Sequence, residues 1–238
     1  MRILITHLTR MHGGHICVAG VDQQTRRHVR PVLNNAEPLP FYLLARYGGP
    51  FEMGWIVDLG QPRPAPDPPH VEDHVFVPAR AKPERPAAAH EFWTLLEELE
   101  RPRLREIFGT GLCETGRDRY GTELGQGIAS LGFLRPAAPP RLYLTQSREG
   151  KPQVRMKLSD GQIEADAGVT DLRLFGDDHA TPEPALIRAV AQWIADSQGV
   201  ILSVGLTRKF RPSDAAASRH WLQVNNVHLK ENATWRLG

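Results

Sequence analysis

The chain has 238 residues, with 29 lysines and arginines against 27 aspartates and glutamates, and 41% of its residues are hydrophobic. These values fit one large or two small folded domains and exclude a disordered tail protein. No stretch approaches the ~18 uninterrupted apolar residues of a membrane span, and the apolar run after Met1 is closed by His7 and Arg10 too early for a secretory signal. Two cysteines, Cys17 and Cys113, cannot form a disulfide framework. We therefore expect a cytoplasmic protein with no membrane association.

Positive charge gathers at the two ends of the chain. Residues 1–50 and residues 201–238 each hold six cationic against two acidic side chains, whereas residues 51–100 hold four against ten. Arginine supplies 24 of the 29 cationic residues, and its planar guanidinium suits phosphate or carboxylate oxygens. The position of these charges, more than their number, is the informative feature.

The first half of the chain has the turn residues and apolar runs of a β-rich protein. A proline-rich loop at 61–69 lacks the backbone donors to join a ladder. After it the period changes, because apolar residues from Phe92 to Leu99 recur at helical spacing until Pro102 stops the helix. Strands are expected at Arg2–Leu8, His15–Val21, Arg27–Val32, Gly54–Leu59 and Val71–Pro78.

The second half repeats this strand-rich pattern. The segment 109–127 is rich in glycine and charge, and the Ala137-Ala138-Pro139-Pro140 run marks a domain boundary. One helix is expected over about 182–198, with Thr181 as N-cap and Gly199 after the last turn. Strands are expected at Leu142–Gln146, Gln153–Leu158, Val169–Phe175, Val200–Leu206 and His220–Leu229.

A short sequence unit occurs near both ends of the chain. Leu8-Thr9-Arg10 closes a predicted strand and leads through a loop to His15, and Leu206-Thr207-Arg208 closes another and leads to His220. A repeated tripeptide alone is weak support for a duplication, but its matching strand context favours one.

Metal and acid–base chemistry are both poorly supported by the residues. His15 and Cys17 share one face of a strand, but their spacing fits no standard zinc site, so we expect no metal and no cofactor. Asp171 would sit inside a strand, where an ion pair with Arg173 is a better explanation than catalysis. Asp171 and His15 remain the acid–base candidates if the protein is an enzyme.

Five arginines lie at predicted strand ends and would form a rim. A small antiparallel barrel that displays arginines and aromatic side chains on one face can hold single-stranded nucleic acid, with cations for phosphate and rings for base stacking. The alternative is solvated strand ends and tryptophans buried in the core. The arginines are Arg10, Arg30, Arg135, Arg173 and Arg208, and the aromatic candidates are Phe210, Trp221 and Trp55.

The order of several segments resembles the bacterial dual OB-containing domain family. The segments are His15–Asp22, His28–Val32, Ser130–Pro136, Val169–Arg173, Gly205–Arg208 and Trp221–His228. The resemblance spans nearly the whole chain and implies two tandem OB-like barrels with a nucleic-acid or nucleotide ligand. It supplies no established catalytic set.

We therefore predict a mainly β protein of two small antiparallel OB-like barrels. The first, 1–136, carries a helical insertion at about 87–108, and the second, 137–238, carries the helix at about 182–198. The predicted function is a non-catalytic module for single-stranded nucleic acid or a nucleotide, in which Arg10, Arg30 and Arg208 contact phosphate, with Arg135 and Arg173 as further candidates and Trp221 and Phe210 as stacking residues. The alternatives are a hydrolase or nuclease-like enzyme acting on nucleic acid and a protein-interaction adaptor using the acidic 72–100 region.

Overall fold

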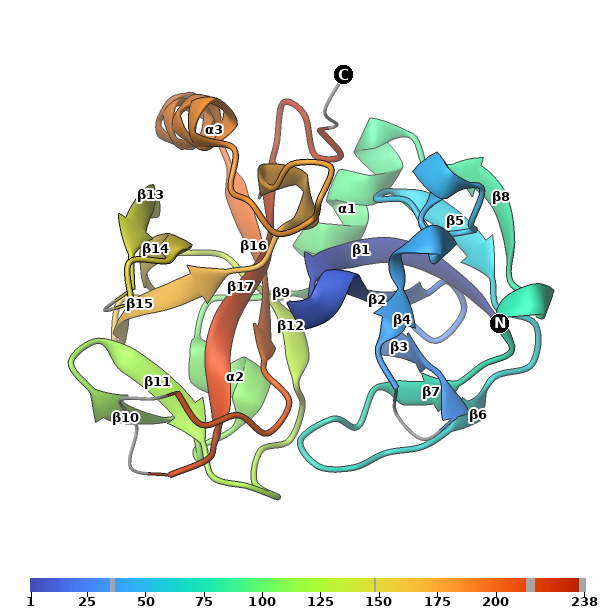
Figure 1. Ribbon diagram of the computed structural model, residues 1–238, viewed down its shortest axis with the longest axis horizontal. Helices are drawn as coiled ribbons and strands as arrows, with labels where there is room; N and C mark the ends of the chain where they lie inside the picture. Colours follow the sequence, from blue (N-terminus) through green and yellow to red (C-terminus); the bar gives the residue numbers. More distant parts are fainter. Residues whose placement is uncertain (35–36, 148, 213–216, 236–238) are drawn as a thin grey trace.

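Two β-sheets lie side by side in the computed structural model, which describes residues 1–34, 37–147, 149–212 and 217–235 (Figure 1). The first sheet, blue to blue-green, is built from the N-terminal part of the chain, and the second, green to red, from the rest. Each sheet has its own hydrophobic core. The prediction of a mainly β protein is confirmed.

The first sheet has the order β6-β7-β3-β2-β1-β5-β8, with β4 paired to β2. Most pairs are antiparallel, but β3 and β7 are parallel. Isoleucine, leucine and valine of its central strands fill the core, and β1 is buried over seven consecutive residues, so both of its faces are covered. The strands are β1 (Arg2–Arg10), β2 (His15–Asp22), β3 (His28–Val32), β4 (Leu39–Pro40), β5 (Trp55–Asp58), β6 (Arg63–Pro64), β7 (Asp73–Val75) and β8 (Lys82–Pro86).

The second sheet has the order β13-β14-β15-β17-β16-β12-β9, and the β10–β11 hairpin joins it through β17. It is also mixed, since β15 is parallel to β17 and β12 is parallel to β9. The strands are β9 (Glu100–Arg101), β10 (Cys113–Gly116), β11 (Arg119–Thr122), β12 (Leu131–Leu134), β13 (Arg141–Gln146), β14 (Pro152–Ser159), β15 (Glu164–Val169), β16 (Val200–Leu206) and β17 (His220–Leu229).

Among the described residues, three α-helices accompany the sheets: α1 (Ala89–Leu99), α2 (Leu104–Phe108) and α3 (Pro184–Asp196). The helical spacing read from the sequence is confirmed, because α1 buries Phe92 and Leu96 in the first core and α3 buries Val190 and Ile194 in the second. In the described ranges, no helix is long and apolar enough to span a membrane.

The expected closed antiparallel barrels are not formed. Within the described residues both sheets are open and mixed. Proline supplies one physical reason, since it lies in both edge strands of the first sheet, at Pro64 in β6 and at Pro83 and Pro86 in β8, and cannot donate to a further strand. In the second sheet, Pro102 follows the two-residue edge strand β9. Each sheet therefore ends at an edge where one more paired strand would be needed to close a barrel.

Several element boundaries differ from the sequence-based expectation. The expected strand Val169–Phe175 is wrong, because β15 ends at Val169 and Leu172–Leu174 form a 3-10 turn. The proline-rich loop does contribute a strand, β6, and the glycine-rich segment contains the β10–β11 hairpin. β9 to β12 all belong to the second sheet, so the chain changes sheet near residue 100. The division into domains at 1–136 and 137–238 stays a prediction.

The buried side-chain amide of Asn226 joins β17 to β1. The Leu8 amide donates to Asn226 Oδ1 at 2.9 Å, and Asn226 Nδ2 donates to the Leu8 carbonyl at 3.0 Å. Ser203 Oγ also donates to the Thr6 carbonyl at 3.0 Å. These contacts replace a strand ladder between the sheets and fix the end of β1 close to the end of β16.

Candidate functional site

A pocket of about 480 Å³ lies where the two repeated strand ends meet. Thr9 and Arg10 at the end of β1, and Thr207 and Arg208 just after β16, all line it. The Arg10 amide donates to the Thr170 carbonyl at 2.9 Å, which fixes the direction of the β1 end. The two copies of the Leu-Thr-Arg unit, far apart in the sequence, thus contribute to one site.

Asp73 ties two of the pocket arginines together. Parallel pairing of β3 with β7 sets Arg30 opposite Asp73, and Arg30 Nε donates to Asp73 Oδ1 at 2.6 Å. Arg208 Nη2 donates to the other oxygen, Asp73 Oδ2, also at 2.6 Å. The Arg30 and Asp73 side chains are 5% and 4% exposed and that of Arg208 is 37% exposed. One buried carboxylate therefore holds guanidinium groups from both sheets at the pocket.

Arg30 keeps an unused donor. Its Nη2 atom is buried and has no hydrogen-bond partner among the described residues. An unmade hydrogen bond at a buried donor costs free energy, so this nitrogen favours an incoming acceptor. Burial, followed by the positive charges of Arg30 and Arg208, lowers the pKa of the adjacent His70 to about 2, so His70 is neutral and adds no charge.

Arg10 is held by a separate set of contacts. Its Nε donates to the His179 carbonyl at 3.1 Å, and its guanidinium carbon lies 4.7 Å from the centre of the Phe175 ring. Burial lowers the pKa of Arg10, and the nearby Asp178 carboxylate acts in the opposite direction. Neither of these two contacts uses the terminal nitrogens, which remain available to a ligand in the described structure.

Apolar groups complete the pocket. Ile16, Val32 and Leu39 line it, and so does Phe210, whose side chain is 56% exposed. Trp221 takes a supporting position, because its Nε1 donates to the Phe210 carbonyl at 2.9 Å and Arg119 lies over its ring at 4.9 Å. Of the two predicted stacking residues, Phe210 is thus at the pocket and Trp221 lies behind it.

An aromatic patch adjoins the pocket and was missed by the sequence reasoning. We define it as Phe41, Tyr42, Tyr47 and His179; the first three are 45%, 60% and 43% exposed. Ring centres of Phe41 and Tyr47 lie 5.2 Å apart, and those of Tyr47 and His179 lie 5.9 Å apart. The His179 carbonyl contact to Arg10 connects the patch to the pocket. In the sequence, the adjacent Phe41-Tyr42 pair after Pro40 is the feature that could have indicated this patch.

Arg173 and Asp171 lie elsewhere, in a buried ion pair. Arg173 Nε and Nη2 donate to the two Asp171 oxygens at 2.8 and 2.7 Å, and the side chains are 7% and 0% exposed. Arg173 also donates to the Trp235 and Val227 carbonyls and lies 3.7 Å from the Trp235 ring centre. The expected ion pair is present. It occupies the Arg173 guanidinium that a ligand would need and the Asp171 carboxylate that a catalytic acid would need.

Arg135 pairs with two carboxylates of the acidic 72–100 region. Arg135 Nε donates to Glu100 at 2.5 Å and its Nη2 lies 3.5 Å from Glu97. Arg135 is 40% exposed and does not line the pocket. The acidic region makes further ion pairs in Arg2–Glu84, Arg26–Glu98 and Arg85–Glu91.

The acid–base pair suggested by the sequence is not assembled. His15 Nδ1 contacts the His12 carbonyl at 3.2 Å, whereas the Asp171 carboxylate is taken by Arg173 and by the Val227 amide. Burial raises the pKa of the Cys17 thiol at the pocket wall, which disfavours the nucleophilic thiolate. Within the described ranges, no three histidine, cysteine or acidic side chains gather as a metal site.

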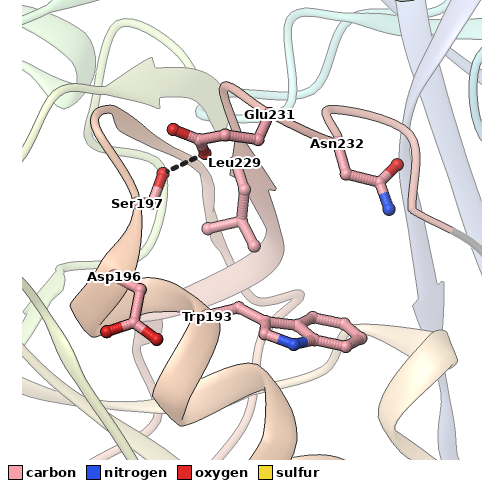
Figure 2. A pocket seen from close by; sticks show the side chains of 6 residues that line it. All are labelled: Trp193, Asp196, Ser197, Leu229, Glu231 and Asn232. Carbon is pink, nitrogen blue, oxygen red and sulfur yellow. Dashed lines mark hydrogen bonds between the residues drawn. The ribbon is translucent and has the colours of Figure 1, made fainter.

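A second, smaller pocket of about 290 Å³ lies between α3 and the end of β17 (Figure 2). Trp193 forms one side of it, and the carboxylates of Asp196 and Glu231 lie at its edge. Glu231 accepts from Ser197 Oγ at 2.7 Å. Its two carboxylates make this pocket a poor site for an anion.

Comparison with known proteins agrees with the family suggested by the sequence. No curated protein matches the chain. One solved structure, titled "Structure of murine DNA binding protein bound with ds DNA", aligns at 9% identity and a TM-score of 0.32, covering 94% of this chain and 91% of that chain; a score this low does not establish a shared fold. The model of the family described as "Dual OB-containing domain" matches residues 1–227. Because that match covers nearly the whole length, the chain belongs to the dual OB-containing domain family.

Proposed function

We propose that this protein is a binding module for single-stranded nucleic acid or a nucleotide, and that its arginine pocket holds phosphate. The observation that carries the proposal is the convergence of Arg10, Arg30 and Arg208, from three separate segments, on one pocket. Membership of the family supports it, since OB-type domains use a strand face and its loops to bind oligonucleotides.

The chemistry of the pocket fits this role. Guanidinium groups donate charge-assisted hydrogen bonds to phosphate oxygens. Asp73 already holds Arg30 and Arg208 in place, so little side-chain freedom is lost when a phosphate enters. Phe210 and the three exposed rings of the aromatic patch, Phe41, Tyr42 and Tyr47, offer surfaces on which bases stack.

Binding of labelled single-stranded DNA and RNA over a salt series tests the proposal. Each phosphate contact to a single strand contributes about 0.7 to the slope of log affinity against log salt. Arg208→Met should therefore flatten the slope by about 0.7, and Arg10→Met should act similarly. Arg30 is left unchanged because it is buried against Asp73.

Arg135→Met is the matched control. Arg135 is 40% exposed against 37% for Arg208, and each is paired with a carboxylate, but Arg135 lies outside the pocket. The control should leave both affinity and slope unchanged. A folded Arg10→Met/Arg208→Met double variant with wild-type affinity and slope would remove the pocket from the binding site.

A further inference from the structure

We infer that the pocket selects a terminal phosphomonoester, on a strand end or a mononucleotide, over the internal phosphodiesters of a continuous strand. The inference rests on the proposed function and adds the class of phosphate that the pocket prefers. A phosphomonoester carries close to two negative charges at neutral pH and three terminal oxygens. A phosphodiester carries one charge and two such oxygens.

The cationic lining of the pocket favours a dianion over a monoanion. Arg10, Arg30, Arg208 and Lys209 line it, and they face two carboxylates, those of Glu37 in the lining and of Asp73 beneath it. Cationic side chains in direct contact with the pocket therefore outnumber these two carboxylates. The Glu72 carboxylate also acts on Arg30, but its oxygens already accept three hydrogen bonds, from Ser130 and Leu131.

The number of donors also matches three oxygens. The three arginines approach from different segments: Arg10 from β1, Arg30 from β3 and Arg208 from the segment after β16. Arg30 Nη2 is buried without a partner in the described structure and lacks only an acceptor. A phosphate with three terminal oxygens can give one to each guanidinium, which a diester cannot do.

The size of the pocket indicates a single nucleotide unit. Its volume of about 480 Å³ lies in the range of pockets that enclose one small molecule. A site that follows a strand is instead an extended groove, covering several nucleotides for each OB domain. Ile16, Val32 and Leu39 give this pocket an apolar wall beside its arginines, as a base and a phosphate together would require.

The surface beyond Arg10 disfavours a continuing strand. The charge of the nearby Asp178 carboxylate acts to raise the pKa of Arg10. Hydrogen bonds from Thr181 lower the pKa of Asp178 to about 2, so this carboxylate is ionised. Arg46, further along, is already paired with Asp177. A second phosphate leaving the pocket on this side would meet negative charge.

The test compares one oligonucleotide sequence in four forms: with a 5′-phosphate, with a 3′-phosphate, with hydroxyls at both ends, and as a closed circle. Affinities are measured by fluorescence anisotropy with an internal label. We expect one phosphorylated linear form to bind at least about ten-fold tighter than the hydroxyl form and the circle, equivalent to about 1.4 kcal/mol. Arg208→Met should remove this advantage, and Arg135→Met should preserve it.

Calorimetry with a mononucleotide and with the matching nucleoside completes the design. Binding of the mononucleotide alone supports the inference even if no oligonucleotide binds, and it assigns the pocket to free nucleotides. Equal affinity for all four oligonucleotide forms would overturn the inference and leave the proposed function standing. Absence of binding to every oligonucleotide and to the mononucleotide would overturn both.

Discussion

Replacing Arg173 by methionine should destabilise the fold without weakening ligand binding. The substitution keeps much of the side chain's length but leaves the Asp171 carboxylate, which is 0% exposed, without its ionic partner. Breaking a buried ion pair on one side costs about 3–5 kcal/mol. For a chain of this size that loss corresponds to a fall in Tm of roughly 6–20 °C.

Urea unfolding followed by tryptophan fluorescence measures this effect. Trp235 is a suitable reporter because Arg173 lies 3.7 Å from its ring centre. Arg155→Met is the control, since Arg155 pairs with Asp166 in the same sheet but the two side chains are 24% and 23% exposed. That partly solvated pair should contribute no more than about 1 kcal/mol.

A double variant separates the buried charge from the lost contacts. Arg173→Met combined with Asp171→Asn removes both charges and should be less destabilised than Arg173→Met alone, because no unpaired carboxylate is left in the core. The reasoning fails if Arg173→Met costs less than about 1 kcal/mol. It also fails if, under conditions where both variants are folded, Arg173→Met weakens nucleic-acid binding as much as Arg208→Met.

Three further outcomes are expected. Asn226→Leu strands the Leu8 amide and carbonyl between the sheets, so urea unfolding should show a loss of about 1–3 kcal/mol for each group; an unchanged midpoint would show that the amide is dispensable. Burial lowers the pKa of His228 to about 3 in the folded protein, so the unfolded chain takes up this proton first. Below about pH 6.5 this one residue should therefore lower stability by up to 1.4 kcal/mol per pH unit, in addition to the losses from His7 and His28, whose pKa values burial also lowers. In His228→Gln the slope should be smaller, and an identical slope would contradict the assignment. Phe210→Ala should weaken nucleic-acid binding by about 1–3 kcal/mol and leave the salt slope unchanged, as anisotropy over the salt series will report; a flattened slope would mean that stacking is not its role.

Much of the local structure could be predicted from the sequence. The strands Val200–Leu206 and His220–Leu229 and the helix carrying Val190 and Ile194 lie where apolar spacing and turn residues indicated. Such patterns are decided by neighbours within a few residues, because backbone periodicity and turn chemistry are local. Where local signals conflict they failed, as at Asp171, whose carboxylate accepts from the Arg173 amide and begins a 3-10 turn in place of a strand.

The repeated Leu-Thr-Arg unit identified Arg10 and Arg208 as a pair, and Asp171, two residues before Arg173, already indicated an ion pair for that arginine. Nothing in the sequence indicated that Asp73 would pair with both Arg30 and Arg208. Whether an arginine is neutralised inside the protein or remains at a pocket depends on which carboxylates folding brings to it. Asp171 pairs with Arg173 in the core, whereas Asp73, 135 residues before Arg208, holds that guanidinium at the pocket. Local sequence therefore determined where the strands run, and the tertiary structure decided which charges remain for a ligand, because electrostatic compensation depends on distance in space and not on distance along the chain.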